Sequence, residues 1–171
     1  MDIFSHGLYG GVAFGRKTKR DYITAFLFGI GPDLLAFGPF FIFAFLGFVP
    51  FPTGRIEPPS SNVIPEYIHS LYNFTHSFII YALFFALLWF LGKKTFAKLT
   101  LGWPLHILID MPVHSLNFFP TPFLWPVSDF HIDGVPWSNP YIFFPNIIVL
   151  LVLYVFWFFK KKRKRLENQN N

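Results

Sequence analysis

The apolar runs of this chain carry histidine and aspartate residues, which membrane-spanning helices normally exclude. The densest example is His106–His114, in which His106, Asp110 and His114 are spaced four residues apart. His76 lies at the start of another apolar run, and Asp33 interrupts a third. A charged side chain at the centre of a bilayer costs about 2.5–3.5 kcal/mol even on lenient insertion scales. These residues are therefore candidates for a functional role.

The composition is that of an integral membrane protein. Of the 171 residues, 53% are hydrophobic and only 13% are charged, whereas a soluble domain carries about 25% charged residues. The chain contains no cysteine, which excludes disulfides, thiolate metal ligands and cysteine nucleophiles. The length predicts one domain.

Thirteen of the fourteen lysine and arginine residues fall in three clusters, at residues 16–20, 93–98 and 160–165, and only Arg55 stands apart. Each cluster lies at the end of an apolar run, as the positive-inside rule describes. We therefore expect a plasma (inner) membrane protein with a cytoplasmic C-terminus. No cleavable signal peptide is expected, because the first cations follow the first apolar segment. Nucleic-acid binding is not expected either, because the cations flank spans and no groove-reading motif is present.

We predict an all-α integral membrane protein with about four transmembrane helices, at residues 22–49, 68–91, 96–115 and 142–159. A short, partly inserted N-terminal helix at 2–15 precedes them, and Gly29, Gly31 and Pro32 break the first run. The proline-rich segments 50–65 and 116–140 are expected to be outer loops, the second ordered at the membrane interface. Residues 1–159 would then form a single membrane-embedded helical domain, and 160–171 a basic cytoplasmic tail.

The buried polar residues share a similar predicted depth. At about 1.5 Å of rise per residue, their distances from the basic clusters place them roughly 12 to 25 Å above the inner surface. Residues four apart share one face of a helix, so His106 and Asp110 can point at one centre. We predict one metal site from four segments, with the ligands His6, Asp33, His76, His106, Asp110 and His114.

Imidazole and carboxylate ligands without sulfur suit a divalent metal, with Zn²⁺ the first candidate and Mn²⁺ or Fe²⁺ as alternatives. Six ligands are many for one tetrahedral ion, so the site could hold one or two ions. Asp33 and His114 are the catalytic candidates, completing a second metal site or acting as a base. No separate organic cofactor site is predicted.

Several residues also have simpler interpretations. Asp33 could cap the helix that follows it, and His6 and His114 could be histidines at a helix end and at the outer interface. Thr75 and Ser77 fit intramembrane hydrogen-bonding groups better than nucleophiles. We expect the remaining ionisable residues of the outer side to be solvated residues of the loops or of their edges. They are Glu57, Glu66, His69, Asp129, His131 and Asp133.

The order of these motifs resembles the YdjM-like membrane-bound metal-dependent hydrolases. The resemblance covers roughly residues 6–137 and depends on His6, Pro32-Asp33, Thr75-His76-Ser77, His106 with Asp110, and Leu124-Trp125-Pro126. It implies a helical inner-membrane protein with a His/Asp metal site, hydrolytic activity, and a distant similarity to zinc-dependent phospholipase C and related nucleases. Two positions depart from the family pattern: Leu71-Tyr72 replaces a common His-Arg pair, and Met111–His114 replaces a Thr-rich sequence.

The leading hypothesis is a membrane-embedded metal-dependent hydrolase acting on an amphiphilic substrate, lipid-like or a lipid-linked ester or phosphoester, near the outer leaflet. Membrane lipids and this substrate are the expected partners, and the oligomeric state stays open. Arg55 is the one outer-side cation available for a phosphate, and residues 118–137 would form the substrate rim. The main alternative is a non-catalytic metal-binding or ion- or proton-translocating protein. A haem protein with axial histidines and a membrane scaffold without a site are further alternatives.

Overall fold

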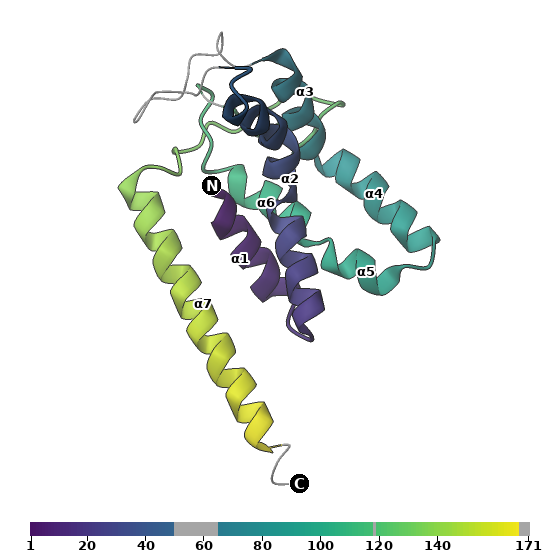
Figure 1. Cartoon of the computed structure of the whole chain (residues 1–171), viewed down its shortest axis with the longest axis vertical. Helices are drawn as coiled ribbons and strands as arrows, with labels where there is room; N and C mark the ends of the chain where they lie inside the picture. The colour runs from purple at the N-terminus through teal and green to yellow at the C-terminus, as the bar shows by residue number, and fades with distance from the viewer. Residues whose placement is uncertain (50–64, 118, 168–171) are drawn as a thin grey trace.

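The computed structural model describes residues 1–49, 65–117 and 119–167, and all regular secondary structure in this part is helical. The predictions for Arg55, Glu57 and most of the 50–65 loop lie outside the described residues, as do Phe118 and the end of the tail, 168–171. The helices are α1 (Ile3–Phe14), α2 (Lys19–Phe45), α3 (Glu66–Thr75), α4 (Phe78–Phe90), α5 (Lys94–Leu99), α6 (Gly102–Asp110) and α7 (Pro140–Glu167). Figure 1 shows α1, α2 and α6 in the middle, with α7 along one side and α4 projecting on the other.

Helices α1 and α2 form a tight hairpin. The side chains of Asp2 and Thr18 cap them, each accepting a hydrogen bond from a backbone N–H in the first turn (2.9 and 3.0 Å). Gly15 is the C-cap of α1. A side chain does not fit at this position, because its Cβ would collide with the backbone of Tyr22. The short N-terminal helix expected from the sequence is thus confirmed, and its glycines allow it to pack closely on α2.

Helix α2 is continuous, although the sequence predicts a break near Gly29, Gly31 and Pro32. It runs for 27 residues and contains both Pro32 and Pro39. Proline is tolerated inside membrane helices where neighbouring groups satisfy the backbone atoms that it frees. In the turn before Pro32, the carbonyl of Gly29 forms a hydrogen bond with the His106 side chain.

The predicted span 68–91 is two helices, α3 and α4, joined at His76 and Ser77 with a bend of 54°. Ser77 begins α4 as its N-cap, since its Oγ accepts hydrogen bonds from the N–H groups of Ile79 and Ile80 (3.1 and 3.3 Å). The same hydroxyl donates to the carbonyl of Trp125. The bend therefore follows from a capping residue in the middle of an apolar run.

The predicted span 96–115 is wrong as a single helix. It is divided into α5 and α6, with a turn at Thr100 and Leu101. The Thr100 hydroxyl donates to the carbonyl of Ala97 (2.8 Å) and ends α5 locally. Pro104 has no backbone N–H to continue a helix from α5, so α6 starts anew at Gly102. Helix α6 ends at Asp110, just before Pro112.

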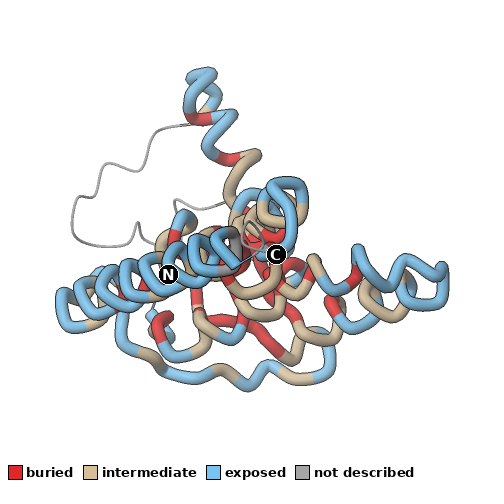
Figure 2. The backbone as a smooth tube through the Cα atoms, turned by 90° about the horizontal axis from the view of Figure 1, so that it is seen from below, coloured by how far each residue is buried: buried red, intermediate tan, exposed pale blue. Residues whose placement is uncertain are grey.

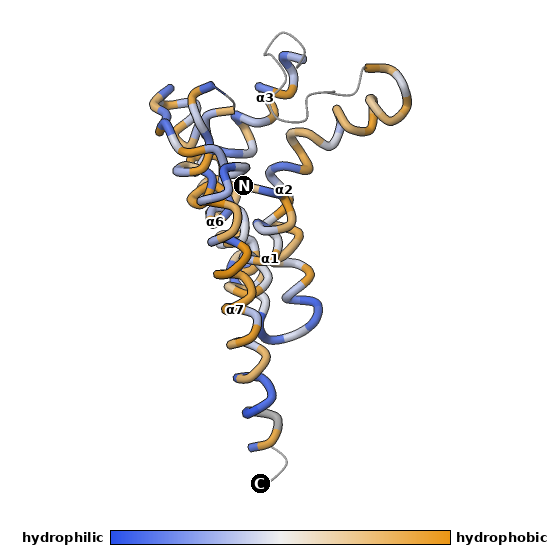
Figure 3. Tube along the Cα trace, turned by 90° about the vertical axis from the view of Figure 1, so that its left-hand side faces the viewer, coloured by the Kyte–Doolittle hydropathy of each residue, from blue (hydrophilic) through white to orange (hydrophobic). Residues whose placement is uncertain are grey.

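Among the described residues, two helices are long and apolar enough to cross a membrane, α2 and residues 140–163 of α7, and the bent pair α3–α4 makes a third if it is one span. The expectation of about four spans is therefore too high, because the predicted span 96–115 is divided between α5 and α6. Buried residues gather in the middle of the molecule, and exposed residues cover its periphery (Figure 2). Helix α7 is apolar over most of its length and hydrophilic at its C-terminal end (Figure 3). A surface this apolar is that of a membrane protein.

The segment 111–139, between α6 and α7, is ordered by backbone hydrogen bonds to its own first residues. The N–H groups of Gly134, Val135 and Trp137 donate to carbonyl groups of residues 112–114 (2.8–3.0 Å). Phe119 and Phe123 enter the core, against Tyr72 of α3 and Trp103 of α6 respectively. The described residues of this segment thus form the loop expected between the last two apolar runs, and Phe119 and Phe123 pack it against α3 and α6. Its place at the membrane interface stays a prediction.

Candidate metal centre

The centre is built around two histidines from separate helices. The Nε2 atoms of His76, at the α3–α4 bend, and His106, in α6, lie 3.0 Å apart. His106 Nδ1 lies 2.7 Å from the carbonyl oxygen of Gly29, and His76 Nδ1 lies 3.2 Å from that of Tyr72. A carbonyl oxygen can only accept, so each Nδ1 can donate to its neighbouring carbonyl. Where both Nδ1 atoms donate in this way, the lone pairs of the two Nε2 atoms face each other, and a metal ion or a proton between them would satisfy both.

Two carboxylates complete this group. Asp33 Oδ1 lies 3.5 Å from His76 Nε2 and 3.7 Å from His106 Nε2, and Asp110 Oδ2 lies 3.1 Å from His106 Nε2. The ligand atoms of Asp33, His76, His106 and Asp110 all lie within 4.8 Å of one another, so these four residues could hold a metal ion. Asp33 lies inside α2 and does not cap a helix, which removes the simpler interpretation of this residue.

The other two predicted ligands lie on the far side of Asp110. His6 Nε2 is 2.9 Å and His114 Nε2 is 3.5 Å from Asp110 Oδ1. The His6 ring stacks on the His106 ring, with 3.6 Å between centroids. The α-amino group of Met1 contacts Asp110 Oδ1 and lies 3.2 Å from His114 Nε2. The structure thus brings all six predicted residues together, and their role as ligands stays a prediction.

The burial of these groups fits a bound cation. The side chains of His6, His76, His106 and Asp110 are at most 1% exposed, whereas those of Asp33 and His114 are 14% and 9% exposed. Asp110 Oδ2 lies 3.1 Å from His106 Nε2 and Asp110 Oδ1 lies 2.9 Å from His6 Nε2, whereas His6 Nδ1 is buried without a hydrogen-bond partner among the described residues. A buried carboxylate is costly unless positive charge lies beside it, and a metal ion would supply such charge. Nitrogen and oxygen ligands without sulfur suit the metals expected from the sequence.

Residues outside the predicted set orient the ligands. The Tyr72 ring stacks on the His76 ring (3.8 Å between centroids), and its hydroxyl donates to the carbonyl of Phe119 (3.0 Å). His114 Nδ1 donates to the same carbonyl (2.9 Å). Partners of this kind fix the tautomer and ring orientation of metal-binding histidines. Sequence analysis missed this role of Tyr72, although its position four residues before His76 placed it on the same helix face.

Thr75 and Ser77 act as hydrogen-bonding groups, as the sequence predicts. Thr75 Oγ1 lies 3.0 Å from His76 Nδ1, and its backbone carbonyl accepts a hydrogen bond from Trp103 Nε1 (2.6 Å). The haem alternative does not fit His76 and His106 as an axial pair. Metal–nitrogen bonds are about 2 Å long, so opposite ligands lie about 4 Å apart, which is more than the observed 3.0 Å.

The remaining ionisable residues of this side lie outside the centre. His69 stacks on Phe119, with 4.8 Å between ring centroids, and His131 is half-buried in the 111–139 segment. Glu66, Asp129 and Asp133 are exposed. Asp133 Oδ1 accepts a hydrogen bond from the backbone N–H of Leu116 (3.0 Å). These positions match the solvated loop or loop-edge locations that the sequence indicates.

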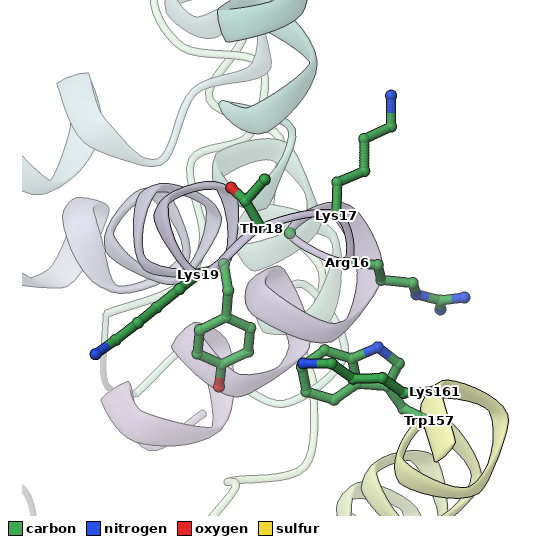
Figure 4. Close-up of a pocket in the computed structure, with 8 residues that line it drawn as sticks. Arg16, Lys17, Thr18, Lys19, Trp157 and Lys161 are labelled. Atoms are coloured by element: carbon green, nitrogen blue, oxygen red, sulfur yellow. The ribbon is translucent and has the colours of Figure 1, made fainter. Parts of the chain in front are cut away.

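A separate hollow of about 270 Å³ lies between the α1–α2 turn and α7, and shares no lining residue with the His/Asp group. Its lining includes Arg16, Lys17, Lys19, Trp157 and Lys161. Figure 4 shows the Lys161 side chain beside the Trp157 ring, while Lys17 and Lys19 point away from each other. Because the lysines diverge, this basic hollow does not form a compact ligand cage like the His/Asp group.

Comparison with known proteins finds no matching family model, no matching curated protein and no matching solved structure. The resemblance to the YdjM-like hydrolases stays a hypothesis based on the motifs themselves. The function must therefore be argued from the geometry of the centre.

Proposed function

We propose that this protein is a membrane-embedded metal-dependent hydrolase that acts on an amphiphilic ester or phosphoester. The observation that carries the proposal is the cluster of the His76 and His106 Nε2 atoms, 3.0 Å apart, with carboxylate oxygens of Asp33 and Asp110, all within 4.8 Å of one another. Zn²⁺ suits this ligand set best, and Mn²⁺ or Fe²⁺ can replace it.

A metal ion bound in this group supplies a water of pKa about 7 and polarises the bond to be cleaved. We assign metal binding to the buried side chains of the centre and proton transfer to the more exposed ones. In this proposal, His76, His106 and Asp110 would hold the ion together with Asp33, and the greater exposure of Asp33 and His114 supports their assignment as the residues that exchange protons with a substrate. Asp33 accepts a proton as a general base, and His114 is the second candidate for this role.

The substrate is proposed to enter from the side of the 111–139 segment. Trp125 and Trp137 in this segment suit the membrane–water interface, and the exposed surfaces of α2 and α7 face lipid. With the basic clusters in the cytoplasm, this segment lies at the outer leaflet and the C-terminus inside. An amphiphilic molecule could then place its polar group at the centre while its apolar part stays in the membrane.

The proposal is tested on the full chain purified in detergent, by metal analysis with mass spectrometry and by screening lipid-linked phosphoesters and carboxylic esters with and without chelator. We expect bound metal and chelator-sensitive hydrolysis in the wild type, and neither in Asp110→Ala. The matched control is His131→Ala, which removes a histidine outside the centre. Full metal content in Asp110→Ala would remove the basis of the assignment.

A non-catalytic metal-binding or ion-translocating protein is the competing candidate, favoured by the near-complete enclosure of the centre. Transport requires the ion to leave on the other side of the membrane. Metal flux into liposomes that carry the protein, without hydrolysis of any ester, would select this candidate over the hydrolase.

A further inference from the structure

The hollow between the α1–α2 turn and α7 gathers positive charge from two distant parts of the chain. Its lining comes from residues 15–22 and from α7, and four of the eight lining residues are basic while none is acidic. Figure 4 shows Arg16 on the turn and Lys161 on α7. All four cations are exposed, so an anion can reach them. They are Arg16, Lys17, Lys19 and Lys161.

The charge of this hollow is not neutralised by the described residues. Among these, the ion pair that involves a lysine or arginine side chain joins Arg163 to Glu167, and neither residue lines the hollow. Arg16 Nε donates to the carbonyl of Val12, which holds the guanidinium group beside the turn. Like charges that meet at one junction repel each other. An anion in the hollow would therefore stabilise the contact between α7 and the α1–α2 hairpin.

Aromatic contacts hold the α7 side of the hollow in place. The Trp157 ring stacks on the Tyr22 ring, with 5.6 Å between centroids and 8° between planes. Lys161 Nζ lies 5.6 Å from the centre of the Trp157 ring, a favourable cation–π distance. The Tyr22 hydroxyl lies 2.7 Å from that of Tyr154. Because these contacts involve only the protein's own side chains, the hollow is formed before any anion binds.

The hollow lies where two candidate membrane spans end. Helix α2 begins at Lys19, and the apolar part of α7 ends at Arg163. Tryptophan is favoured at the level of lipid head groups, which suits Trp157. Both spans also carry exposed apolar side chains near the hollow, which are Ile23 and Leu27 in α2 and Val155 and Phe158 in α7. A phospholipid matches both features, because its phosphate meets the cations and its acyl chains meet the apolar side chains.

We infer that this hollow is a discrete binding site for the head group of an anionic phospholipid. The phosphate would lie between Arg16 and Lys161, since a guanidinium group binds phosphate oxygens in pairs. Lys17 and Lys19 diverge (Figure 4), which suits a head group spread over a surface better than an enclosed ion. With the basic clusters in the cytoplasm, the lipid belongs to the inner leaflet. It would join α7 to the α1–α2 hairpin, independently of the His/Asp centre.

The experiment titrates the full chain, purified in detergent, with phosphatidylglycerol and with uncharged phosphatidylcholine. Native mass spectrometry counts retained lipids, and thermal unfolding measures stabilisation. We expect one phosphatidylglycerol per chain and a higher melting temperature with this lipid only. The double variant Arg16→Gln with Lys161→Gln should bind it roughly 25-fold more weakly, because each cation near an anionic lipid contributes about fivefold.

The matched control is Arg20→Gln with Lys162→Gln. It removes the same charge from the same two segments, but neither residue lines the hollow, so it should bind phosphatidylglycerol nearly as the wild type does. Loss of the Arg16 bond to Val12 could unfold the first double variant. In that case Lys161→Gln is compared with Lys162→Gln, and about fivefold weaker binding is expected in the former only.

Three results would overturn the inference. An equal loss of binding in both double variants would mean that general positive charge, and not the hollow, attracts the lipid. Equal retention of phosphatidylcholine, or of no lipid at all, would remove the anionic lipid site. Stabilisation by inorganic phosphate as large as that by phosphatidylglycerol would assign the hollow to a free anion. None of these readouts depends on bound metal or on hydrolysis, so the proposed function is tested separately.

Discussion

At the scale of single residues, Gly29 links helix packing to the orientation of a metal-binding histidine. Its carbonyl accepts the hydrogen bond from His106 Nδ1. A Cβ on Gly29 would collide with the backbone carbonyl of His6 and come within 3.0 Å of Gly7 Cα. The close approach of α1 to α2 at this point therefore allows His6 to reach the ring of His106.

Gly29→Ala should destabilise the protein by about 1–3 kcal/mol, because the added methyl group overpacks the α1–α2 contact. It should also weaken metal binding about 10–100-fold, the usual effect of disturbing a residue that orients a ligand. Thermal unfolding in detergent and metal titration measure the two effects. The control is Gly31→Ala in the same helix, which meets no atom within 4 Å and should be neutral. Equal behaviour of the two variants would contradict the packing argument.

Metal binding should stabilise the native state. At a free metal concentration of one hundred times Kd, one site contributes about 2.7 kcal/mol. Chelator should therefore lower the melting temperature of the wild type. In Asp110→Asn, which loses the carboxylate facing both His6 and His106, the melting temperature should not depend on chelator. An equal chelator effect in both proteins would place the metal elsewhere.

The sequence predicts the members of the centre but not the groups that orient them. Spacing by four residues correctly places His106 and Asp110 on one face, with 3.1 Å between Nε2 and Oδ2. The distances from the basic clusters predict His6 and His76 within one slab of the membrane, and the structure brings both near Asp110, at 2.9 and 3.7 Å from its carboxylate oxygens. Their depth in a membrane stays a prediction. The carbonyl partners of the histidines could not be predicted, because every residue has a carbonyl and only the tertiary arrangement selects those of Gly29 and Phe119.

At the scale of helices, the bend between α3 and α4 places His76 at the centre. A straight helix through residues 68–91 would continue the backbone hydrogen bonding that Ser77 interrupts. The sequence predicts one span over residues 68–91 because both helices are apolar. The only sign of the break is Ser77, a single residue that can cap a helix. Between α5 and α6, the sequence shows Gly102 and Pro104 in the first turn of α6, but hydrophobicity alone does not show that the turn before them divides a span.

Ser77→Ala should cost about 1–2 kcal/mol, since it removes an N-cap and the hydrogen bond to the carbonyl of Trp125. The bend should also become less well defined, so metal affinity should fall with stability. Ser70→Ala is the matched control, because Ser70 is exposed and its hydroxyl only donates to the carbonyl of Glu66 at 3.4 Å. Chemical denaturation of both variants tests this prediction, and a loss as large in the control would contradict it.

At the scale of the whole molecule, α7 joins the other helices through polar contacts on an otherwise apolar surface. Asn146 accepts a hydrogen bond from the Tyr9 hydroxyl and donates to Ser5 Oγ (both 2.8 Å). The Tyr154 hydroxyl donates to the carbonyl of Leu8 (3.0 Å) and lies 2.7 Å from that of Tyr22. Such contacts contribute about 0.6–2 kcal/mol each within membranes. They bring Trp157 and Lys161 of α7 to the hollow lined by the basic α1–α2 turn, and α7 continues beyond this turn (Figure 1).

This arrangement predicts that the basic clusters share one side of the membrane. The chain contains no cysteine, so single cysteines can be introduced at Lys17, Arg163 and Asp129 without background labelling. In intact cells, an impermeant maleimide should label Asp129→Cys only, while Lys17→Cys and Arg163→Cys should react after permeabilisation. Labelling of Arg163→Cys in intact cells would reverse the proposed orientation.

The long sequence separation between the members of the centre sets an order of events during synthesis. His6 precedes His106 by 100 residues and Asp33 precedes it by 73, yet α1 and α2 both pack on α6 in the finished protein. The first helical hairpin therefore enters the membrane while its histidine and aspartate still lack their partners. The complete ligand set forms only after α6 has been inserted, so full metal loading is a late step of biogenesis.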